Sequence, residues 1–404
     1  MYHGAGDRLW VSKLRMDQGA RRDRVAGSRG EKDMAWNFDD LTAGSGGAPP
    51  VASPCKLASH VFEAQGTQHV FYRAADQRIV ELWWRGGEAP HWGYLTTPGN
   101  GAPLAAGDPA SHVFDAEGTQ HVFYRAFDGG ANGRIVELWW KGGETPHWGY
   151  LTTPGNQAPL AASDPASHVF DAEGTQHVFY RSTGNQVIEL WWSGGAAAQV
   201  SNLTERSGGA PLADGDPASH VFDAEGTQHV FYRAAPGDAD SQIIELWWRP
   251  GQLPQFVKLS ERSGGPRAAG DPVSHVFAAE GTQHVFYTSV DDGLIELRWP
   301  GFPPPSRDLL NGAGGAESPA SKPASHVFAA KDMEHVFYIG ADLHIRRFGM
   351  RGDEKPALQD LVIASGGCPL AISGPASHVF NTEGTQHVFY TTSDDHVIEL
   401  WSTE

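Results

Sequence analysis

Three residue types recur along the chain at a spacing that would let them act on one small polar ligand. An arginine follows each of several Val-Phe-Tyr runs, and a Glu-Leu-Trp-Trp run comes shortly after it. Arginine donates hydrogen bonds in a fork, a carboxylate accepts them from adjacent hydroxyls, and an indole covers the apolar C–H patch of a sugar ring. A neutral sugar needs these three groups together. The candidate binding residues are Arg73, Glu81, Trp83, Arg125, Glu137, Trp139, Arg181, Glu189, Trp191, Arg233, Glu245, Trp247, Glu296, Glu399 and Trp401.

The same pattern also fits a structural role, in which arginine and glutamate form ion pairs beneath a core tryptophan. The sequence leaves both interpretations open. Three later copies of the pattern depart from it. Thr288 and Arg298 replace the arginine and the tryptophan in one copy, Ile339 and Arg346 replace the arginine and the glutamate in the next, and Thr391 replaces the arginine in the last. Any binding site in those copies is therefore in doubt.

These residues belong to a repeat that covers most of the chain, which is the first feature to read in such a sequence. A Ser-His-Val-Phe run occurs seven times, at intervals of 51 to 56 residues. Each copy continues with a Gly-Thr-Gln-His-Val-Phe-Tyr run or a variant, then the Glu-Leu-Trp-Trp run, then a fourth short run. The histidines of the first run are His60, His112, His168, His220, His275, His326 and His378.

The four runs of each copy predict four β-strands. They are rich in Val, Ile, Phe, Tyr, Trp and Thr, and Gly, Asp, Asn and Pro separate them. Four strands in roughly 50 residues is the size of one β-propeller blade. The strands alternate poorly between apolar and polar residues, as expected when both faces of a blade pack on neighbours. The sequence therefore predicts an all-β, seven-bladed β-propeller with four antiparallel strands per blade, over residues 34–404.

The two ends of the repeat region predict how the ring closes. The last copy stops at Glu404 without a fourth run, whereas Trp36 to Leu41 looks like a fourth strand that has no blade of its own. From Met34 to His60 is 26 residues, and from His378 to the end is another 26, so together they make one repeat of 52. We expect the N-terminal strand to complete the last blade, which removes two exposed sheet edges.

Register within a blade decides which side chains share a face. A three-residue turn over residues 75–77 would pair Arg73 with Ile79. That pairing predicts one face with Arg73, Glu81 and Trp83 together.

Charge argues against some partner classes. The formal net charge is −18, although residues 1–34 hold eight Lys and Arg against five Asp and Glu. The repeat region is thus strongly acidic, which excludes nucleic acid and anionic membrane surfaces as natural partners. No apolar run is long enough for membrane insertion. Residues 1–33 have no signal-peptide core, so we expect a basic, disordered tail or residues preceding a true start at Met34, and a protein that is cytoplasmic or exported by a non-classical route.

Cysteines and histidines predict no metal or cofactor. Cys55 and Cys368 are the only cysteines, and their different offsets from the following Ser-His favour two free thiols over a disulfide. The fourteen repeat histidines, two per copy, could line a central channel. A seven-fold ring is too wide for one ion, and no carboxylate accompanies it at ligand spacing. We therefore expect each histidine to be buried and hydrogen-bonded within its own blade.

The repeats, with their Glu-Leu-Trp-Trp runs, resemble the fucose-specific β-propeller lectins, above all the bacterial seven-bladed ones. The resemblance extends from Ala35 to Glu404. It implies sugar pockets between consecutive blades, with fucose or related deoxy or O-methylated sugars as ligands. It also implies that the Arg, Glu and Trp positions hold the sugar. Glycans on cell surfaces or glycoconjugates would then be the partners, and a homo-oligomer is left open.

Two other function classes remain. A protein-interaction scaffold without sugar binding would suit the acidic surface, although the Gly-His and Trp-Asp signatures of the common scaffold propeller are missing. A glycosidase or other hydrolase is a weaker alternative. The sequence has no nucleophile elbow and no unique carboxylate pair, so we expect the protein not to be an enzyme.

Overall fold

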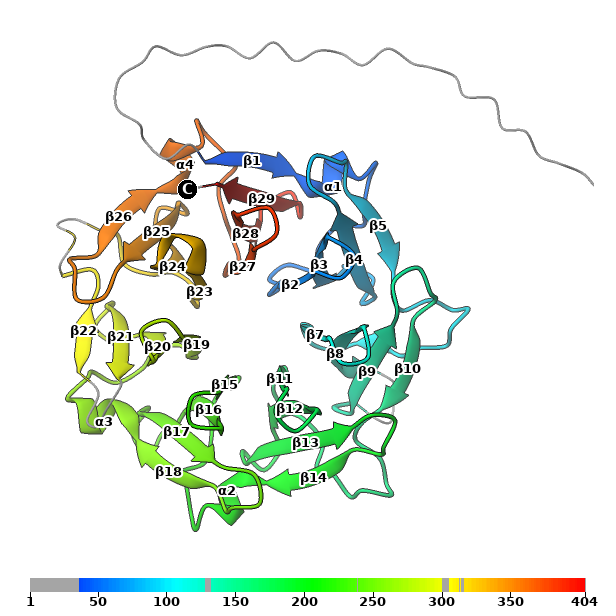
Figure 1. The fold of residues 1–404 in the computed structure, drawn as a ribbon, viewed down its shortest axis with the longest axis vertical. Coiled ribbons are helices and arrows are strands. Elements are labelled where there is room, and N and C mark those ends of the chain that lie inside the picture. Colours follow the sequence, from blue (N-terminus) through cyan, green and yellow to red (C-terminus); the bar gives the residue numbers. More distant parts are fainter. Residues whose placement is uncertain are drawn as a thin grey trace, which may run out of the picture. The chain divides into compact units, whose positions relative to one another are not determined.

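The strands form a ring of seven antiparallel sheets (Figure 1). The structure, a computed structural model, describes residues 36–127, 132–237, 239–299, 305–311, 313 and 316–403. It confirms the all-β, seven-bladed propeller. The expectation for residues 1–33 lies outside the described residues.

Blades 1 to 7 are numbered in chain order, and in each the first strand lies nearest the ring centre and the last at the rim (Figure 1). Blade 1 has β2 (Ala58–Phe62), β3 (Thr67–Arg73), β4 (Ile79–Trp84) and β5 (His91–Tyr94). Blade 2 has β7 (Ala110–Phe114), β8 (Thr119–Phe127), β9 (Ile135–Trp140) and β10 (His147–Tyr150), and the short β6 (Leu104–Ala105) also pairs with β8. Blade 3 has β11 (Ala166–Phe170), β12 (Thr175–Arg181), β13 (Val187–Ser193) and β14 (Gln199–Asn202). Blade 4 has β15 (Ala218–Phe222), β16 (Thr227–Arg233), β17 (Ile243–Trp248) and β18 (Gln255–Lys258).

The remaining blades follow the same order. Blade 5 has β19 (Val273–Phe277), β20 (Thr282–Thr288), β21 (Leu294–Trp299) and β22 (Ser306–Asp308). Blade 6 has β23 (Ala324–Phe328), β24 (Met333–Ile339), β25 (Ile345–Met350) and β26 (Ala357–Asp360). Blade 7 has β27 (Ala376–Phe380), β28 (Thr385–Thr391) and β29 (Val397–Ser402), and its outer strand is β1 (Asn37–Asp40).

The N-terminal strand closes the ring as predicted. Strand β1 pairs antiparallel with β29, and Asn37 lies opposite Trp401 (Figure 1). The strand is slightly shorter than the predicted Trp36 to Leu41, because Leu41 begins the short helix α1 (Leu41–Gly44). His396 and Asp40 add an ion pair of 2.7 Å between the two chain ends.

The predicted register within blade 1 is also confirmed. Arg73 lies opposite Ile79. Further along the same pair of strands, Phe71 lies opposite Glu81 and His69 lies opposite Trp83. Alternate residues of a strand point to the same face, so His69, Glu81 and Trp83 face the same neighbouring blade.

The hydrophobic core lies between blades. Tyr72, Leu82 and Trp84 of blade 1 pack with Phe389 and Val397 of blade 7, and equivalent clusters fill other interfaces. Both faces of a blade are thus buried, which explains the poor apolar–polar alternation of its strands.

Short helices follow several outer strands. They are α1, α2 (Leu203–Arg206), α3 (Leu259–Ser263) and α4 (Leu361–Ala364), and a 3-10 turn covers Ala329–Lys331. Asp40, Asn202 and Asp360 cap the first, second and fourth through side-chain oxygens that accept a backbone N–H. Among the residues described, no helix is long and apolar enough to cross a membrane. Cys55 and Cys368 are buried free thiols, as expected.

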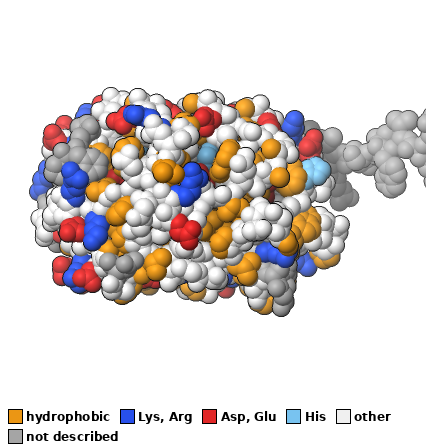
Figure 2. Space-filling model, turned by 90° about the horizontal axis from the view of Figure 1, so that it is seen from below, with side chains coloured by type: hydrophobic (Ala, Val, Ile, Leu, Met, Phe, Trp, Pro, Cys, Tyr) orange, Lys and Arg blue, Asp and Glu red, His pale blue; other side chains and the backbone are white. Residues whose placement is uncertain are grey.

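The rim of the ring mixes charges with apolar residues. Figure 2 views it from the side where α2, β14 and β18 lie in Figure 1, and acidic, basic and hydrophobic side chains are interspersed there. On this side the surface shows no extended basic stripe of the kind that nucleic acid requires.

Candidate functional site

Two cavities lie at consecutive blade interfaces. The larger, of about 580 Å³, lies between blades 1 and 2, and Glu81, Trp83 and His69 contribute to its lining. The second, of about 380 Å³, lies between blades 7 and 1, and Glu399 and Trp401 contribute to it. Both volumes suit one or two sugar rings.

The two cavities are built from equivalent residues, a set that we call the interface hexad. One blade supplies the threonine and histidine of its second strand and the glutamate and first tryptophan of its third strand. The next blade supplies the glutamine of its second strand and the second tryptophan of its third strand. These residues are Thr67, His69, Glu81 and Trp83 with Gln120 and Trp140 in the larger cavity, and Thr385, His387, Glu399 and Trp401 with Gln68 and Trp84 in the smaller.

A chain of hydrogen bonds organises the polar half of the hexad. Thr67 Oγ1 and His69 Nε2 are 2.7 Å apart, and His69 Nδ1 and Glu81 Oε1 are 2.7 Å apart. Equivalent Thr–His–Glu chains occur in blades 2, 3, 4, 5 and 7. Each glutamate is thereby held in one orientation.

Burial makes this His–Glu pair electrically neutral. It raises the pKa of Glu81 to about 8 and lowers the pKa of His69 to about 3. Burial likewise raises the pKa of Glu137 to about 8 and lowers that of His121 to about 4. Each pair therefore holds one proton between carboxylate and imidazole near pH 7 and has no net charge. Such a pair can exchange hydrogen bonds with a neutral ligand.

Aromatic rings form the apolar half. Trp83 is half-buried and stacks on His91, with ring centroids 5.7 Å apart and planes at 30°. Trp140 of the next blade packs edge-on against Phe71 at 6.2 Å, which fixes that ring across the interface. An indole face beside a neutral polar pair is suited to a molecule with one apolar and one hydroxylated side.

The residue opposite the glutamate on the outer strand sets the width of the cavity. Gly93 lies opposite Glu81, whereas Asp39 lies opposite Glu399 and accepts a hydrogen bond from Trp401 Nε1 at 3.1 Å. The glycine adds no side chain against the Trp83 ring, and the cavity that contains it is the larger of the two. The equivalent residues in blades 2, 3 and 4 are Gly149, Ser201 and Val257.

The arginines do not join this constellation. Arg73 lies four residues along β3 from His69, roughly 13 Å away, and pairs with Asp108 from the loop before β7 at 3.2 Å. Arg125 likewise lies 3.7 Å from Asp164 of the following loop. Arg181 donates to Asn185 at 2.7 Å, and Arg233 pairs with Asp214 at 2.8 Å. The structure thus brings together the predicted glutamates and tryptophans, and places the arginines at the opposite end of the strands, in contacts that include interblade ion pairs.

Five of the seven interfaces keep the whole hexad: those between blades 7 and 1, 1 and 2, 2 and 3, 3 and 4, and 4 and 5. The same five have a tryptophan packed edge-on against a phenylalanine of the preceding blade. The three hexads not yet named are Thr119, His121, Glu137, Trp139, Gln176 and Trp192; Thr175, His177, Glu189, Trp191, Gln228 and Trp248; and Thr227, His229, Glu245, Trp247, Gln283 and Trp299.

The interface between blades 6 and 7 has lost the hexad. Phe337 pairs with Arg347, so Arg347 stands at the glutamate position and the expected Arg346 is wrong by one residue. Trp36 packs edge-on against Phe337 at 6.2 Å, and the Arg347 guanidinium lies 5.7 Å from the Trp36 ring centroid. Ser402 stands where other blades have the second tryptophan, so Trp36 supplies the missing ring from the N-terminal segment.

The interface between blades 5 and 6 is altered differently. Arg298 replaces the first tryptophan and pairs with Glu280 and Asp353 at 2.8 and 2.6 Å. Glu296 keeps its place but accepts a hydrogen bond from Arg307 at 2.7 Å. Charged side chains therefore occupy the position that the first tryptophan fills at the five hexad interfaces.

The innermost histidines bond differently from the expectation. His60 Nε2 lies 2.9 Å from Gln120 Oε1, so its partner belongs to the next blade and not to its own. The expectation of bonding within each blade holds only for second-strand histidines such as His69, because the first strand faces the neighbouring blade. Five further inner histidines contact a glutamine in this way: His112–Gln176, His168–Gln228, His220–Gln283, His326–Gln386 and His378–Gln68.

Sequence reasoning identified the glutamates and first tryptophans but missed the other four residues of the hexad. Thr67, His69 and Gln120 belong to the repeated Gly-Thr-Gln-His run and Trp140 to the Glu-Leu-Trp-Trp run, so the repeat contains the signal. Their role depends on which blade face meets which, and the spacing of residues along the chain does not give that.

Comparison of the sequence with protein-family profiles and with curated proteins gives no match. The fold is similar to that of the BP39L lectin from Burkholderia pseudomallei, with a TM-score of 0.60 and 16% identity over 86% of this chain and 96% of that one. A mutant of AofleA from Arthrobotrys oligospora gives 0.50 and 15% over 84% and 93%. An ancestral GH74 enzyme gives 0.55 and 14% over 85% of this chain and 47% of that chain. At these identities the likeness concerns architecture, and the chain is a seven-bladed β-propeller with the fold of the BP39L lectin.

Proposed function

We propose that the protein is a multivalent lectin that binds neutral sugars in the five interfaces that keep the hexad. The observation that carries this proposal is the repetition of one mixed polar and aromatic constellation, which lines a cavity at two consecutive interfaces. An asymmetric catalytic centre would occur once, whereas a repeated site serves repeated binding.

The chemistry of the hexad matches a sugar ring. The face of Trp83 can cover the apolar C–H patch, while Glu81 and Gln120 exchange hydrogen bonds with ring hydroxyls. In the equivalent site of blade 4, Glu245 Oε2 is buried and has no hydrogen-bond partner among the described residues. A buried carboxylate oxygen needs such a partner, and a sugar hydroxyl would provide it.

Fucose, or a related deoxy or O-methylated sugar, is the proposed ligand. This choice rests on the resemblance of the repeat to fucose-specific propeller lectins. A methyl group on the sugar adds apolar surface that an indole face can cover, which agrees with the exposed part of Trp83.

Each site should bind a monosaccharide weakly, in the millimolar to micromolar range, about −4 to −8 kcal/mol. Several sites on one rigid ring should gain roughly 10²–10⁴ in avidity on a multivalent glycan. A glycan array followed by titration calorimetry with L-fucose and its methyl glycosides tests the proposal. We expect about five equivalents per chain. If no sugar on a broad array binds, the lectin proposal fails and an interaction scaffold replaces it.

One observation favours a hydrolase as second candidate, because hydroxyl, imidazole and carboxylate occur in the order of a catalytic triad. Thr67 is only 6% exposed, and its equivalents recur in five other blades. A buried, repeated hydroxyl is suited to orienting the histidine. A screen with chromogenic glycosides and esters should therefore show no turnover, and turnover that falls in Thr67→Val would favour the hydrolase.

A further inference from the structure

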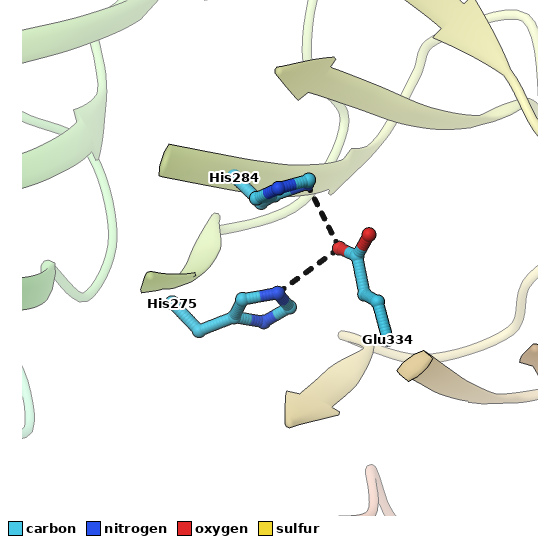
Figure 3. Close-up of side chains that lie close together, drawn as sticks. All are labelled: His275, His284 and Glu334. Atoms are coloured by element: carbon cyan, nitrogen blue, oxygen red, sulfur yellow. Dashed lines mark ion pairs between the residues drawn. The ribbon is translucent and has the colours of Figure 1, made fainter. Parts of the chain in front are cut away.

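Two histidines of blade 5 and one glutamate of blade 6 converge at a single point. Figure 3 shows His275 from β19, His284 from β20 and Glu334 from β24 pointing toward one another. Glu334 Oε1 lies 3.0 Å from His275 Nε2 and 2.9 Å from His284 Nδ1. The ligand atoms of all three residues lie within 4.8 Å of one another, close enough to share one metal ion.

This cluster results from one change in the repeat. Glu334 lies opposite Val327, just as Gln68 lies opposite Val61, so it replaces the glutamine that accepts from an inner histidine at the other interfaces. An amide oxygen is thereby exchanged for a carboxylate. The sequence-based expectation of no metal missed the cluster, because Glu334 lies 50 residues beyond His284 and on the next blade.

In each of the two histidines, the ring nitrogen that does not face Glu334 already has a hydroxyl partner. His275 Nδ1 lies 2.8 Å from Ser325 Oγ, and His284 Nε2 lies 2.8 Å from Thr282 Oγ1. When these nitrogens donate to the hydroxyls, the opposite nitrogens present lone pairs to Glu334. Lone pairs and a carboxylate at such distances require a proton or a cation between them.

A second carboxylate lies in the same place. Glu296 Oε1 is 3.1 Å from His284 Nδ1, while Arg307 Nε donates to Glu296 Oε2 at 2.7 Å. The arginine thus leaves Oε1 directed at the cluster. His284 and Glu296 are each 1% exposed and Glu334 is 4% exposed, whereas the His275 side chain is 11% exposed, so the site is shielded from bulk water except at His275.

We propose that this interface binds one divalent transition-metal ion, with zinc as the best fit, through His275 Nε2, His284 Nδ1 and a carboxylate oxygen of Glu334. Two imidazoles and one carboxylate are a three-ligand set that zinc accepts at about 2.0–2.2 Å per bond, with a fourth position for water. Such bonds place neighbouring ligand atoms of a tetrahedron about 3.3 Å apart, so the three side chains, whose ligand atoms lie within 4.8 Å of one another, would draw together around the ion. The ion would link blades 5 and 6, where the aromatic contact of the five hexad interfaces is missing.

A proton competes with a metal ion for the lone pair of His284. Burial lowers the pKa of His284, but its hydrogen bonds to Glu296 and Glu334 outweigh that effect and raise it to about 9. A metal ion and a proton exclude each other at His284 Nδ1, because the ion needs the lone pair of that nitrogen. Without an ion, the cluster would be a buried ion-pair network.

Metal analysis of the untagged full-length chain distinguishes these two states. The protein is stripped with a chelator and titrated with Zn²⁺, and with Co²⁺ as a spectroscopic probe. We expect one tightly bound equivalent, a rise in melting temperature of several degrees, and the visible absorption of four-coordinate Co²⁺. Less than half an equivalent of zinc after dialysis would overturn the proposal, and so would Co²⁺ spectra of a hexa-aquo ion.

Glu334→Gln is the decisive variant, because it restores the glutamine of the other interfaces and should fold. We expect its zinc affinity to fall at least about a hundredfold, since a direct ligand matters more than outer-shell groups, whose loss costs 10–100-fold. His275→Gln should lose the metal, whereas the matched change His168→Gln between blades 3 and 4 should keep it. Unchanged zinc binding in Glu334→Gln would contradict the assignment. Sugar binding at the five hexads should be unaffected, so failure here is separate from failure of the lectin proposal.

Discussion

One position, the glutamate of the third strand, has a different environment at different places in the ring. In blade 1, Glu81 shares a proton with His69 beside an indole face. In blade 5, Glu296 contacts Arg307 and His284. In blade 6, Arg347 replaces it and lies over Trp36. The neighbours of this position therefore differ from interface to interface, from a neutral polar pair beside an indole to charged contacts.

A residue-scale prediction separates the observed hexad from the arginine-containing site expected from the sequence. Trp139→Ala should remove one of about five sugar equivalents, because it removes the indole platform of the site between blades 2 and 3. Arg125→Ala should leave the stoichiometry unchanged, because Arg125 contacts Asp164 and Ala106 away from the hexad. Calorimetry of both variants with methyl fucoside makes the measurement. A lost equivalent in Arg125→Ala alone would place the site at the arginine.

At the scale of elements, the outer strand is the variable part of each blade. The three inner strands keep nearly the same sequence, while the outer strand places Gly93, Gly149, Ser201, Val257 or Asp39 opposite the glutamate. It also supplies closure of the ring, because β1 pairs with β29. The differences between the hexad interfaces and the closure of the ring thus both lie in outer strands.

A larger side chain on one outer strand should weaken sugar binding at one site without unfolding the blade. A Cβ at Gly149 would lie 3.6 Å from the Trp139 ring, an ordinary contact, so Gly149→Val should be accommodated. The added side chain covers the indole face, and we expect the sugar affinity of that site to fall roughly tenfold or more, about 1.4 kcal/mol. Gly149→Ala serves as the smaller matched change. Equal affinity at all sites in the valine variant would show that this face does not meet the sugar.

The N-terminal strand should be essential for stability. Deletion of residues 1–42 removes β1, Trp36 and the Asp40–His396 ion pair, and should lower the melting temperature sharply. Deletion of residues 1–33 should not. Trp36→Ala is a milder test, since loss of a buried tryptophan costs about 3–5 kcal/mol. Thermal unfolding of the three proteins makes the comparison, and equal melting of both truncations would contradict closure by β1.

At the scale of the whole molecule, an inner belt of histidine–glutamine hydrogen bonds links the blades. Six inner histidines donate from Nε2 to the side-chain oxygen of a glutamine of the next blade. Burial lowers the pKa of each, and in His112 the value falls to about 3. The belt is therefore stable only while these imidazoles stay neutral.

Acid should unfold the ring steeply. A lowered folded-state pKa gives stability that is present above the unfolded value of about 6.5 and is lost as pH falls toward about 3, at about 1.4 kcal/mol per pH unit for each histidine. The pairs His69–Glu81 and His121–Glu137 add little to the pH dependence of stability between pH 4.5 and 6.5, because each folded pair keeps one proton as the unfolded histidine gains one. We expect melting temperature to drop sharply below pH 6.

Proton uptake on unfolding measures this effect directly. Calorimetry at pH 5.5 in buffers of different ionisation enthalpy should show several protons taken up, and about one fewer in His112→Gln, whose amide cannot titrate. Melting that stays constant from pH 7 to pH 5 would show that the belt does not limit stability.

The sequence by itself determined the architecture of this protein. Its seven repeats, four strands per repeat and the 26-residue segments at each end predicted the propeller and its closing strand. The pairing of Arg73 with Ile79 was also predictable, because strand register depends on a local turn and on alternation along the strand. Glu81 and Trp83 were therefore placed on one face correctly.

Only the tertiary structure decided which residues meet between blades. Gln120 and Trp140 of the next blade line the same cavity as Glu81. Asp108 forms an ion pair with Arg73 at the other end of the strand, and Glu334 lies against two histidines of blade 5. Interblade contacts depend on how two twisted sheets pack in a closed ring, and on side-chain volumes at each interface. Spacing along the chain carries no such information, because residues that meet are one blade apart in sequence and only angstroms apart in space.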